Sequence, residues 1–387
     1  MKIDWDELRN DQFPSLKNFT YAMAASASLI CKNAYQKAIE YFNDMYNNGD
    51  IHFDENLEEL NELRKIIADY INTESDNIAF LPNTSSSMNI IAHYLDKAGI
   101  LYPSIEFPAS IHIFRRLGFA CKKIIPTNNK YIIEDFEKLL DGNIKYIVHS
   151  HVQSLTGFKQ NLKELGKFCK ENNLINIINA TQSFGSFPID VKNQDIDILA
   201  CSALKWVCCG YGAGILYIKE RLIKDKEIPF SSWLSVEDPY SLNNENLNII
   251  NKTRYIDVFG GCPNFAALFS LKGALELIKD KIGGGNIKTG IENIKKRILM
   301  LTSEFIKKIE KLNYNIITPL DINYRSGIIT LEHNKAEEIY TYLMNHKIYI
   351  SLKRFPKHSI NTLLRLSFNY YNNLDDIDKI ISLLKKF

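Results

Sequence analysis

The chain has 387 residues, of which 45% are hydrophobic and 24% charged, and its formal net charge is +2. These values are ordinary for a globular protein, so they predict a packed core and exclude extensive disorder. A nearly neutral chain without a basic block is not expected to bind nucleic acid. No apolar run approaches the ~20 residues of a membrane-spanning helix, so we expect no membrane partner.

The first residues, MKIDWDELRND, are charged and lack the apolar centre of a secretory signal. The seven cysteines are an odd number and contain no Cys-x-x-Cys pair, which argues against a disulfide framework and against a zinc site. We therefore expect a cytoplasmic protein with reduced thiols and no bound metal.

The first part of the chain predicts helices and then a strand. Helices are expected over residues 32–46 and 57–71, and the second has apolar residues spaced to form one buried face. A strand over 78–81 leads into the hydroxyl-rich start of another helix, Thr84 to Ser87. Such residues serve as helix caps, and the free N–H groups beside them also make an anion site. The residues alone leave both roles open.

Strands and helices alternate from residue 78 to residue 218, which predicts a mostly parallel, doubly wound sheet. Strands are expected at 146–148, 176–178, 196–201 and 215–218, with a crossover helix over 162–172. The run at 176–178 is apolar and ends on polar residues, as a buried strand does when it delivers side chains to a site.

Lys205 follows the apolar strand 196–201 and stands directly before Trp206. A lysine held at a strand end and desolvated by such neighbours is suited to form a Schiff base. A lysine before a tryptophan is more often an ordinary surface residue, so the residue by itself does not decide between the two.

The residues around Lys205 form a pattern with a fixed order. The pattern consists of Asn179-Ala180-Thr181-Gln182, Gly185, Pro188 to Val191, Asp197, Ser202, Lys205-Trp206 and the Gly-x-Gly-x-Leu-Tyr run from Gly212 to Tyr217. This pattern resembles the class V aminotransferase family. That family comprises pyridoxal-phosphate enzymes of fold type I and includes cysteine desulfurases, kynureninases and isopenicillin-N-epimerase-like proteins. The resemblance implies an α/β fold with a large, doubly wound domain over 20–265. A smaller α+β domain would combine 1–19 with 266–387.

The resemblance also implies how the chain holds pyridoxal phosphate. Lys205 would carry the cofactor as a Schiff base and would serve as the proton-transfer base. The other cofactor contacts, given with the group that each reaches, are Thr84, Ser85 and Ser202 for the phosphate, Phe107 for the ring face, Ser154 and Gln182 for the phenolic oxygen, and Asn179 for the pyridine nitrogen.

Two further segments are similar to the family. The turn at 255–264 resembles the family's Gly-Thr-Pro-Asn turn, in which Gly261 and Cys262 would reach the phosphate of the neighbouring subunit. This implies a homodimer with shared active sites. Arg365 would otherwise be an ordinary strand residue, but the resemblance makes it a clamp for the α-carboxylate of an amino-acid-like small molecule, with Arg354 assisting.

Departures from the family bear on the chemistry. Leu204 stands where the family has histidine, Cys262 replaces threonine, and Asn179 replaces aspartate. Because an amide carries no charge, we expect a mainly neutral pyridine ring and slow transamination, unless a neighbouring group restores protonation. These departures favour the alternative of a weakened relative with a structural or sensing role. The retention of Lys205, Gln182 and Arg365 opposes it.

Which bond breaks is left open by the sequence. Residues 326–335 and 352–366 contain no cysteine where the family's persulfide-forming loop sits, so the desulfurase reaction is disfavoured. An aminotransferase, a β-eliminating lyase and an epimerase remain, each acting on an amino acid or a keto acid.

Overall fold

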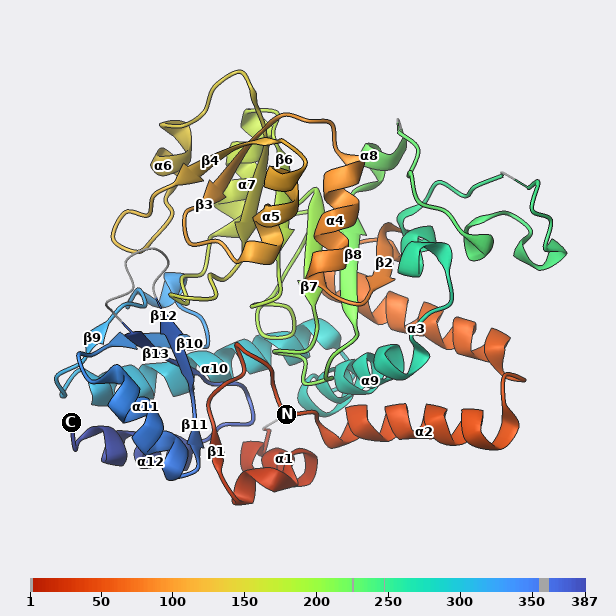
Figure 1. The fold of residues 1–387 in the computed structure, drawn as a ribbon. Helices are drawn as coiled ribbons and strands as arrows, with labels where there is room; N and C mark the ends of the chain where they lie inside the picture. The colour runs from red at the N-terminus through yellow and green to blue at the C-terminus, as the bar shows by residue number, and fades with distance from the viewer. Residues whose placement is uncertain (1–2, 225, 247, 355–361) are drawn as a thin grey trace.

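The computed structural model describes residues 3–224, 226–246, 248–354 and 362–387. Figure 1 shows a large sheet with helices on both sides and a smaller sheet near the C-terminus. The helices are α1 (Trp5–Gln12), α2 (Lys32–Asn48), α3 (Phe53–Ile71), α4 (Thr84–Tyr94), α5 (Pro108–Arg116), α6 (Ile133–Glu137), α7 (Leu162–Glu171), α8 (Glu220–Lys224), α9 (Phe265–Glu276), α10 (Ile287–Ile309), α11 (Ala336–Asn345) and α12 (Leu374–Leu384).

The large sheet has the strand order β2-β8-β7-β6-β5-β3-β4. Its strands are β2 (Ile78–Leu81), β3 (Gly99–Pro103), β4 (Ala120–Ile124), β5 (Ile144–Ser150), β6 (Ile175–Asn179), β7 (Ile198–Ser202) and β8 (Gly214–Ile218). The pairs from β7 to β4 are parallel, whereas β8 runs antiparallel to both of its neighbours. The short link 203–213 leaves no room for a crossover helix, so β8 must run back along β7. The predicted mostly parallel sheet is confirmed.

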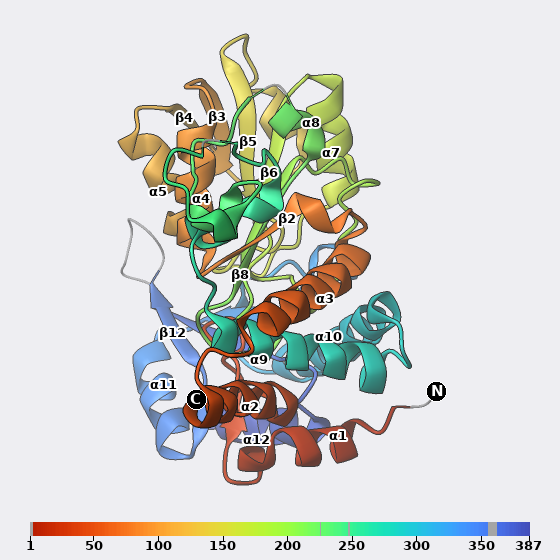
Figure 2. The same ribbon diagram turned by 90° about the vertical axis from the view of Figure 1, so that its right-hand side faces the viewer.

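Both faces of the large sheet are covered, because successive residues of its strands point to opposite sides. Ile177 of β6 packs into a core that contains residues of α4 and α5, and Ile178 packs into a core that contains residues of α3, α7 and α9. Figure 2 shows α4 and α5 on one side of the sheet, with α3 and α7 on the other. Because β5, β6 and β7 are parallel, their carboxyl ends lie at the same edge of the sheet.

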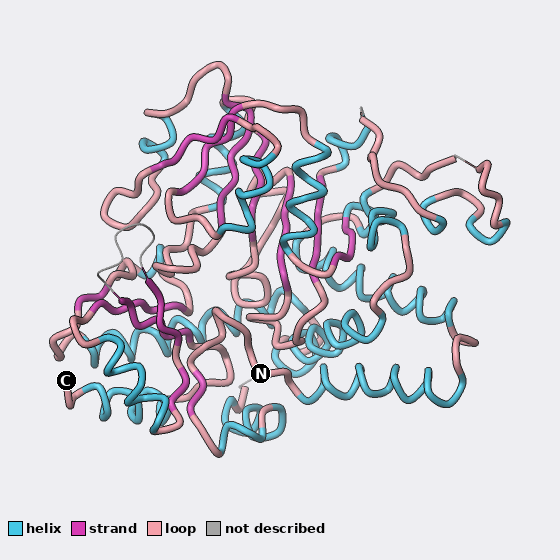
Figure 3. Tube along the Cα trace, in the orientation of Figure 1, coloured by secondary structure: helices cyan, strands magenta, loops and turns pink. Residues whose placement is uncertain are grey.

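The C-terminal region forms an antiparallel sheet of order β12-β13-β10-β9. Its strands are β9 (Asn315–Ile316), β10 (Ile328–Glu332), β12 (Ser351–Arg354) and β13 (Thr362–Ser367), and α10, α11 and α12 contribute to the same core. Figure 3, in which all strands are magenta, shows this sheet apart from the large sheet. The N-terminal strand β1 (Thr20–Tyr21) pairs with β11 (Ile348–Tyr349). The proposed division at 19/20 and 265/266 stays a prediction.

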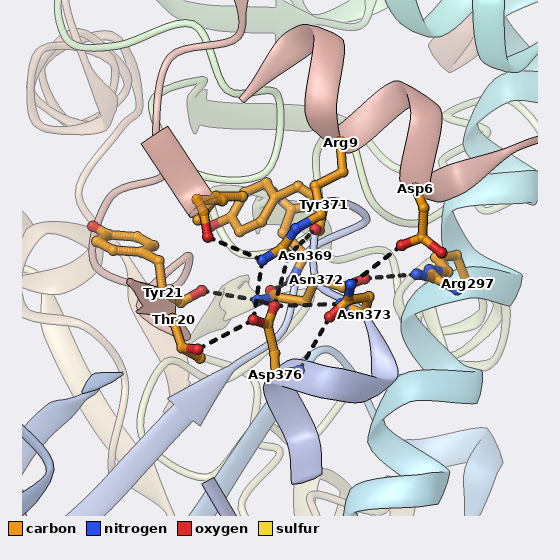
Figure 4. Close-up of polar contacts among 11 residues, drawn as sticks. Asp6, Arg9, Thr20, Tyr21, Arg297, Asn369, Tyr371, Asn372, Asn373 and Asp376 are labelled. Atoms are coloured by element: carbon orange, nitrogen blue, oxygen red, sulfur yellow. Dashed lines mark hydrogen bonds and ion pairs between the residues drawn. The ribbon is translucent and has the colours of Figure 1, made fainter. Parts of the chain in front are cut away.

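A buried ion pair joins the two ends of the chain (Figure 4). Arg9 of α1 donates from Nη1 to Asp376 Oδ2 at 2.7 Å and from Nη2 to Asp376 Oδ1 at 3.0 Å. Asp376, in the first turn of α12, also accepts from Thr20 Oγ1 at 3.2 Å and from Asn372 Nδ2 at 2.9 Å. We call Arg9, Thr20, Asn372 and Asp376 the terminal hub.

Within the described ranges, we find no helix that combines the length and the apolar character needed to cross a membrane.

Candidate active site

The polar residues that follow the parallel strands meet around one cavity of about 220 Å³. The predicted cofactor residues that line it are Thr84, Ser85, Phe107, Ser154, Asn179, Gln182, Ser202 and Lys205. They come from the start of α4, the start of α5, the segment after β5, and the ends of β6 and β7. The sheet therefore brings together side chains that are separated by up to 121 positions in sequence, from Thr84 to Lys205.

Lys205 lies in the link between β7 and β8 and directly precedes the buried Trp206. Trp206 Nε1 donates to Gln182 Oε1 at 3.1 Å, and the tryptophan ring packs so close to Gly327 that an added Cβ there would lie 2.4 Å from it. The Lys205 amine lies 5.6 Å from the centroid of the Phe107 ring. Contacts with Gln182 and Gly327 thus fix the side chain of Trp206, which is next to Lys205 in sequence, and the Phe107 ring faces the Lys205 amine.

The Lys205 amine sits among cations rather than beside a carboxylate. Burial, and then the positive charges of Arg365 and Lys353, lower the pKa of Lys205 to about 7. Among the described residues, no carboxylate lies within ion-pair distance of it. A large fraction of such an amine is neutral at physiological pH, and the neutral amine is the nucleophilic and basic form.

Three hydroxyl groups cluster at the N-terminus of α4. Thr84 Oγ1 lies 2.7 Å from Thr181 Oγ1 and 2.9 Å from Ser202 Oγ, and the Thr84 backbone N–H donates to Ser202 Oγ at 2.9 Å. Asn83 caps the helix by accepting from Ser86 N at 3.0 Å. Hydroxyl donors at the positive end of a helix form a seat for a phosphate group. Thr181 was missed as a site residue, although a hydroxyl residue two positions after a strand-end asparagine was a usable signal.

Asn179 and Gln182 are both held by hydrogen bonds at the edge of the cavity. Asn179 Oδ1 accepts from Thr181 N at 3.0 Å, and Asn179 Nδ2 donates to Ser110 Oγ at 2.8 Å. Gln182 Nε2 donates to the Ala25 carbonyl at 2.9 Å. Because each amide has one oxygen and one nitrogen partner, its orientation is defined before any ligand binds.

Arg365 lies buried behind the cavity wall, where its guanidinium lacks a carboxylate partner among the described residues. It donates to the Ser154 carbonyl and to Ser26 Oγ, each at 2.7 Å, and both serines line the cavity. The Nε atom has no hydrogen-bond partner, and burial lowers the pKa of Arg365 to about 10. A buried, incompletely bonded cation favours a site for an anion.

The structure does not bring Arg354 to the cavity. Its guanidinium is largely exposed and lies 3.6 Å from the Glu337 carboxylate. The strand register gives the reason: Ser351 is paired with Arg365, so Ser351 and Lys353 share the face of Arg365 while Arg354 points to the other face. Lys353 is the cation that sequence reasoning missed, and the charge of Arg365 contributes to lowering its pKa after burial.

Gly261 and Cys262 also lie away from the Lys205 cavity within one chain. Gly261 lines a separate cavity of about 210 Å³ with Arg64 and Arg254, and Cys262 is exposed. Their role toward a second subunit stays a prediction. None of the seven cysteines lines the Lys205 cavity, and five of them are buried as free thiols.

These residues fit pyridoxal phosphate. The hydroxyl cluster suits its phosphate, Phe107 offers a face for its ring, and Lys205 presents a desolvated amine for its aldehyde. A doubly wound sheet with this constellation at the ends of its strands defines an enzyme of fold type I that depends on pyridoxal phosphate.

Comparison with known proteins identifies the family. The model of the family "Aminotransferase class-V" matches residues 20–380, and the chain belongs to that family. A "Probable cysteine desulfurase" of Pyrococcus abyssi is 27% identical over 344 residues, which are 84% of this chain and 82% of the relative. The apo structure of a cysteine desulfurase from Thermococcus onnurineus has a TM-score of 0.87 at 23% identity, covering 100% of this chain and 98% of that one.

A second solved structure is the complex between the cystine C–S lyase C-DES and its reaction product cysteine persulfide. It has a TM-score of 0.84 at 20% identity and covers 97% of this chain and 100% of that one. The predicted fold type, cofactor and family are thereby confirmed. The comparisons give no support to a role limited to structure or sensing.

Proposed function

We propose that this enzyme is a homodimeric, cytoplasmic β-eliminating lyase that acts on a small amino acid with a leaving group at Cβ. The observation that carries the proposal is a pair of cations, Lys205 in the cavity lining and the buried Arg365 behind it. No cysteine is found among the described residues that line the cavity. A desulfurase needs a thiol in the pocket to take up sulfur. An eliminating lyase needs only a base and a carboxylate clamp.

Each protein group has a role in this proposal. Arg365 binds the substrate α-carboxylate and exchanges its bond to Ser26 Oγ for a charge-assisted one. Lys205, whose pKa of about 7 leaves much of the amine neutral, removes the proton from Cα. Thr84, Thr181 and Ser202 hold the cofactor phosphate, and Phe107 covers the ring. Pyridoxal phosphate, when bound, supplies the electron sink that makes the Cα proton acidic.

The second copy in the proposed dimer would cover an apolar stripe on α2. Tyr35, Ile39, Phe42 and Tyr46 follow helical spacing, and their exposed fractions are 58%, 37%, 56% and 89%. The other side of α2 packs on α9, where Tyr41 contacts Phe265 and Phe269. An exposed apolar helix face of this kind is typical of a protein interface. The free thiols support the cytoplasmic assignment.

The reaction is tested with purified enzyme and single amino acids, each supplied without a keto acid. Cystine, cysteine and β-chloroalanine should give pyruvate and ammonia over many turnovers, and Lys205→Ala should abolish both products. Product formation that requires an added keto acid would show an aminotransferase instead. The absence of turnover under either condition would contradict an enzymatic role for the site.

The dimer is tested by sedimentation. Phe42→Glu should place a charge in the proposed interface and release monomers, whereas Asn43→Glu, on the adjacent exposed side of α2, should leave the mass unchanged. A wild-type monomer at micromolar concentration would contradict the shared-site arrangement.

A further inference from the structure

A buried carboxylate stands behind Asn179. Glu106, between β3 and α5, is 9% exposed and accepts five hydrogen bonds. Its Oε1 accepts from Phe107 N at 2.8 Å, from Ser110 Oγ at 3.1 Å and from Ser150 Oγ. Its Oε2 accepts from Ser150 N at 2.7 Å and from Gln153 Nε2 at 3.1 Å. Both oxygens act only as acceptors in these five hydrogen bonds, which is the bonding pattern of a carboxylate.

No cation in the described chain neutralises this carboxylate by an ion pair. The charge of Glu106 acts on two neighbouring titratable groups, His149 and Tyr131. Burial lowers the pKa of His149 in spite of the Glu106 charge, and its Nδ1 donates to the Ser150 carbonyl at 2.5 Å while Nε2 has no partner. Burial raises the pKa of Tyr131 to about 12. Both groups are therefore uncharged at neutral pH, so neither of them offsets the charge of a carboxylate at Glu106.

The hydrogen bonds between Asn179 and Glu106 have one direction. Asn179 Oδ1 accepts from Thr181 N, so the amide cannot flip without setting two N–H groups against each other. Asn179 Nδ2 must then donate to Ser110 Oγ, and the Ser110 hydroxyl is left to donate to Glu106 Oε1. In this series of hydrogen bonds, from Asn179 through Ser110 to Glu106, every donor points toward the Glu106 carboxylate. Hydrogen bonds aligned in this way polarise one another.

We propose that Glu106 is the counter-charge for the pyridine nitrogen of the cofactor, and that Ser110 and Asn179 relay its effect. The proposal rests on the proposed function and on the placement of Asn179 opposite that nitrogen, which the family resemblance implies. A protonated nitrogen can donate to the lone pair of Asn179 Oδ1 that Thr181 leaves unused, which continues the chain in the same direction. Glu106 and Ser110 are positioning residues, because they act through Asn179. Asparagine then replaces the usual aspartate without loss of the nearby negative charge.

The sequence-based expectation of a neutral pyridine ring took only the uncharged side chain of Asn179 into account. Nothing in the sequence marked Glu106 as its neighbour, because residues 106, 110 and 179 meet only in the folded chain. A neutral ring would instead accept the second N–H of Asn179 Nδ2. This opposite arrangement is the alternative outcome of the experiment.

The test compares two ligands that differ only at the ring nitrogen. Apo protein is titrated with pyridoxal phosphate and with 1-deaza-pyridoxal phosphate, in which a C–H group replaces the nitrogen, and binding is followed by tryptophan fluorescence. The wild-type protein should prefer the natural cofactor. Glu106→Gln and Ser110→Ala should each reduce that preference by about tenfold, the equivalent of one pKa unit.

Gln153→Ala is the matched control, since it removes a donor to Glu106 that is not part of the relay. It should keep the preference. In parallel, the 15N chemical shift of labelled cofactor should report a protonated ring nitrogen in the wild type and a shift toward the neutral value in Ser110→Ala. The proposal would be overturned if Glu106→Gln and Ser110→Ala kept the wild-type preference for the natural cofactor, or if Gln153→Ala lost that preference equally. A neutral ring nitrogen in the wild type would also overturn it. Failure of the wild type to bind either ligand would count against the proposed function itself.

Discussion

Two arginines, Arg9 and Arg365, are buried to a similar extent, with 7% and 4% of their surface exposed. Arg9 makes a two-point ion pair with Asp376 and also donates to the Tyr371 carbonyl at 2.6 Å. Within the described part of the chain, the acceptors of Arg365 are one carbonyl and two serine hydroxyls, and its Nε has no partner. The terminal hub therefore has its charge balanced within the chain, whereas the cavity has an excess of positive charge. This difference in charge balance indicates that Arg9 stabilises the fold, whereas Arg365 is suited to bind an anionic ligand.

The largest effect should come from breaking the hub. Asp376→Ala would leave Arg9 buried without its counter-charge, and we expect a loss of about 3–5 kcal/mol in the free energy of unfolding. Urea denaturation measures it. Asp375→Ala, which removes an exposed carboxylate one residue away, should cost less than about 1 kcal/mol. If Asp376→Ala lowered the free energy of unfolding by no more than Asp375→Ala does, the terminal hub would contribute little to stability.

The cavity should respond in the opposite direction when a charge is removed. With the cofactor removed, Lys205→Met should raise the stability at pH 6 by about 2 kcal/mol, because the folded state there carries a partly buried ammonium without an ion pair among the described residues. The pKa of Lys205 is about 7 in the folded protein against 10.5 for an ordinary lysine. The unfolded chain therefore binds more protons between these values, and wild-type stability rises with pH across this window.

The gain from Lys205→Met should accordingly fade between about pH 7 and pH 10.5. Thermal unfolding across this range measures it, with the exposed lysine variant Lys17→Met as the control. A gain that is independent of pH would show that packing, not charge, explains the effect.

Arg365→Met should separate binding from stability. We expect amino acids to bind about 2 kcal/mol more weakly to the holoenzyme, which is the loss of a charge-assisted hydrogen-bonded pair. Simple amines without a carboxylate should bind as before, and the free energy of unfolding should stay the same or increase. Cofactor absorbance during ligand titration measures the binding. Equal weakening for amines and amino acids would contradict the role of Arg365 as a carboxylate clamp.

The smallest expected changes in the free energy of unfolding come from removing one hydroxyl group in each of the two regions. Thr20→Val removes one donor to Asp376 in a closed core and should cost about 1 kcal/mol. Ser26→Ala removes an acceptor of Arg365 at the cavity edge, where water can take its place, so its cost should be less than half as large. Urea midpoints of the two variants, measured side by side, test this. A reversed order would show that the cavity wall is as closed as the hub.

Much of the fold followed from local pattern. The strand 78–81 was predicted with its observed bounds, and the helix over 162–172 and the strands around Lys205 were placed within two residues of their ends. Apolar runs bounded by polar residues specify such strands because both faces of this sheet are buried. The same runs placed Lys205, Asn179 and Ser202 at strand ends, and the hydroxyl-rich start of α4 pointed to an anion seat.

Contacts between distant segments were decided only by the tertiary structure. Arg354 was named from the sequence as the residue that assists Arg365, but the pairing of β12 with β13 turns Arg354 away and places Lys353 on the face of Arg365. The relay from Glu106 through Ser110 to Asn179 joins segments that sequence alone gave no reason to connect. The sequence by itself determined which residues end each strand, because burial acts on local pattern. Strand register and packing decided which of those residues meet, because both depend on the whole chain.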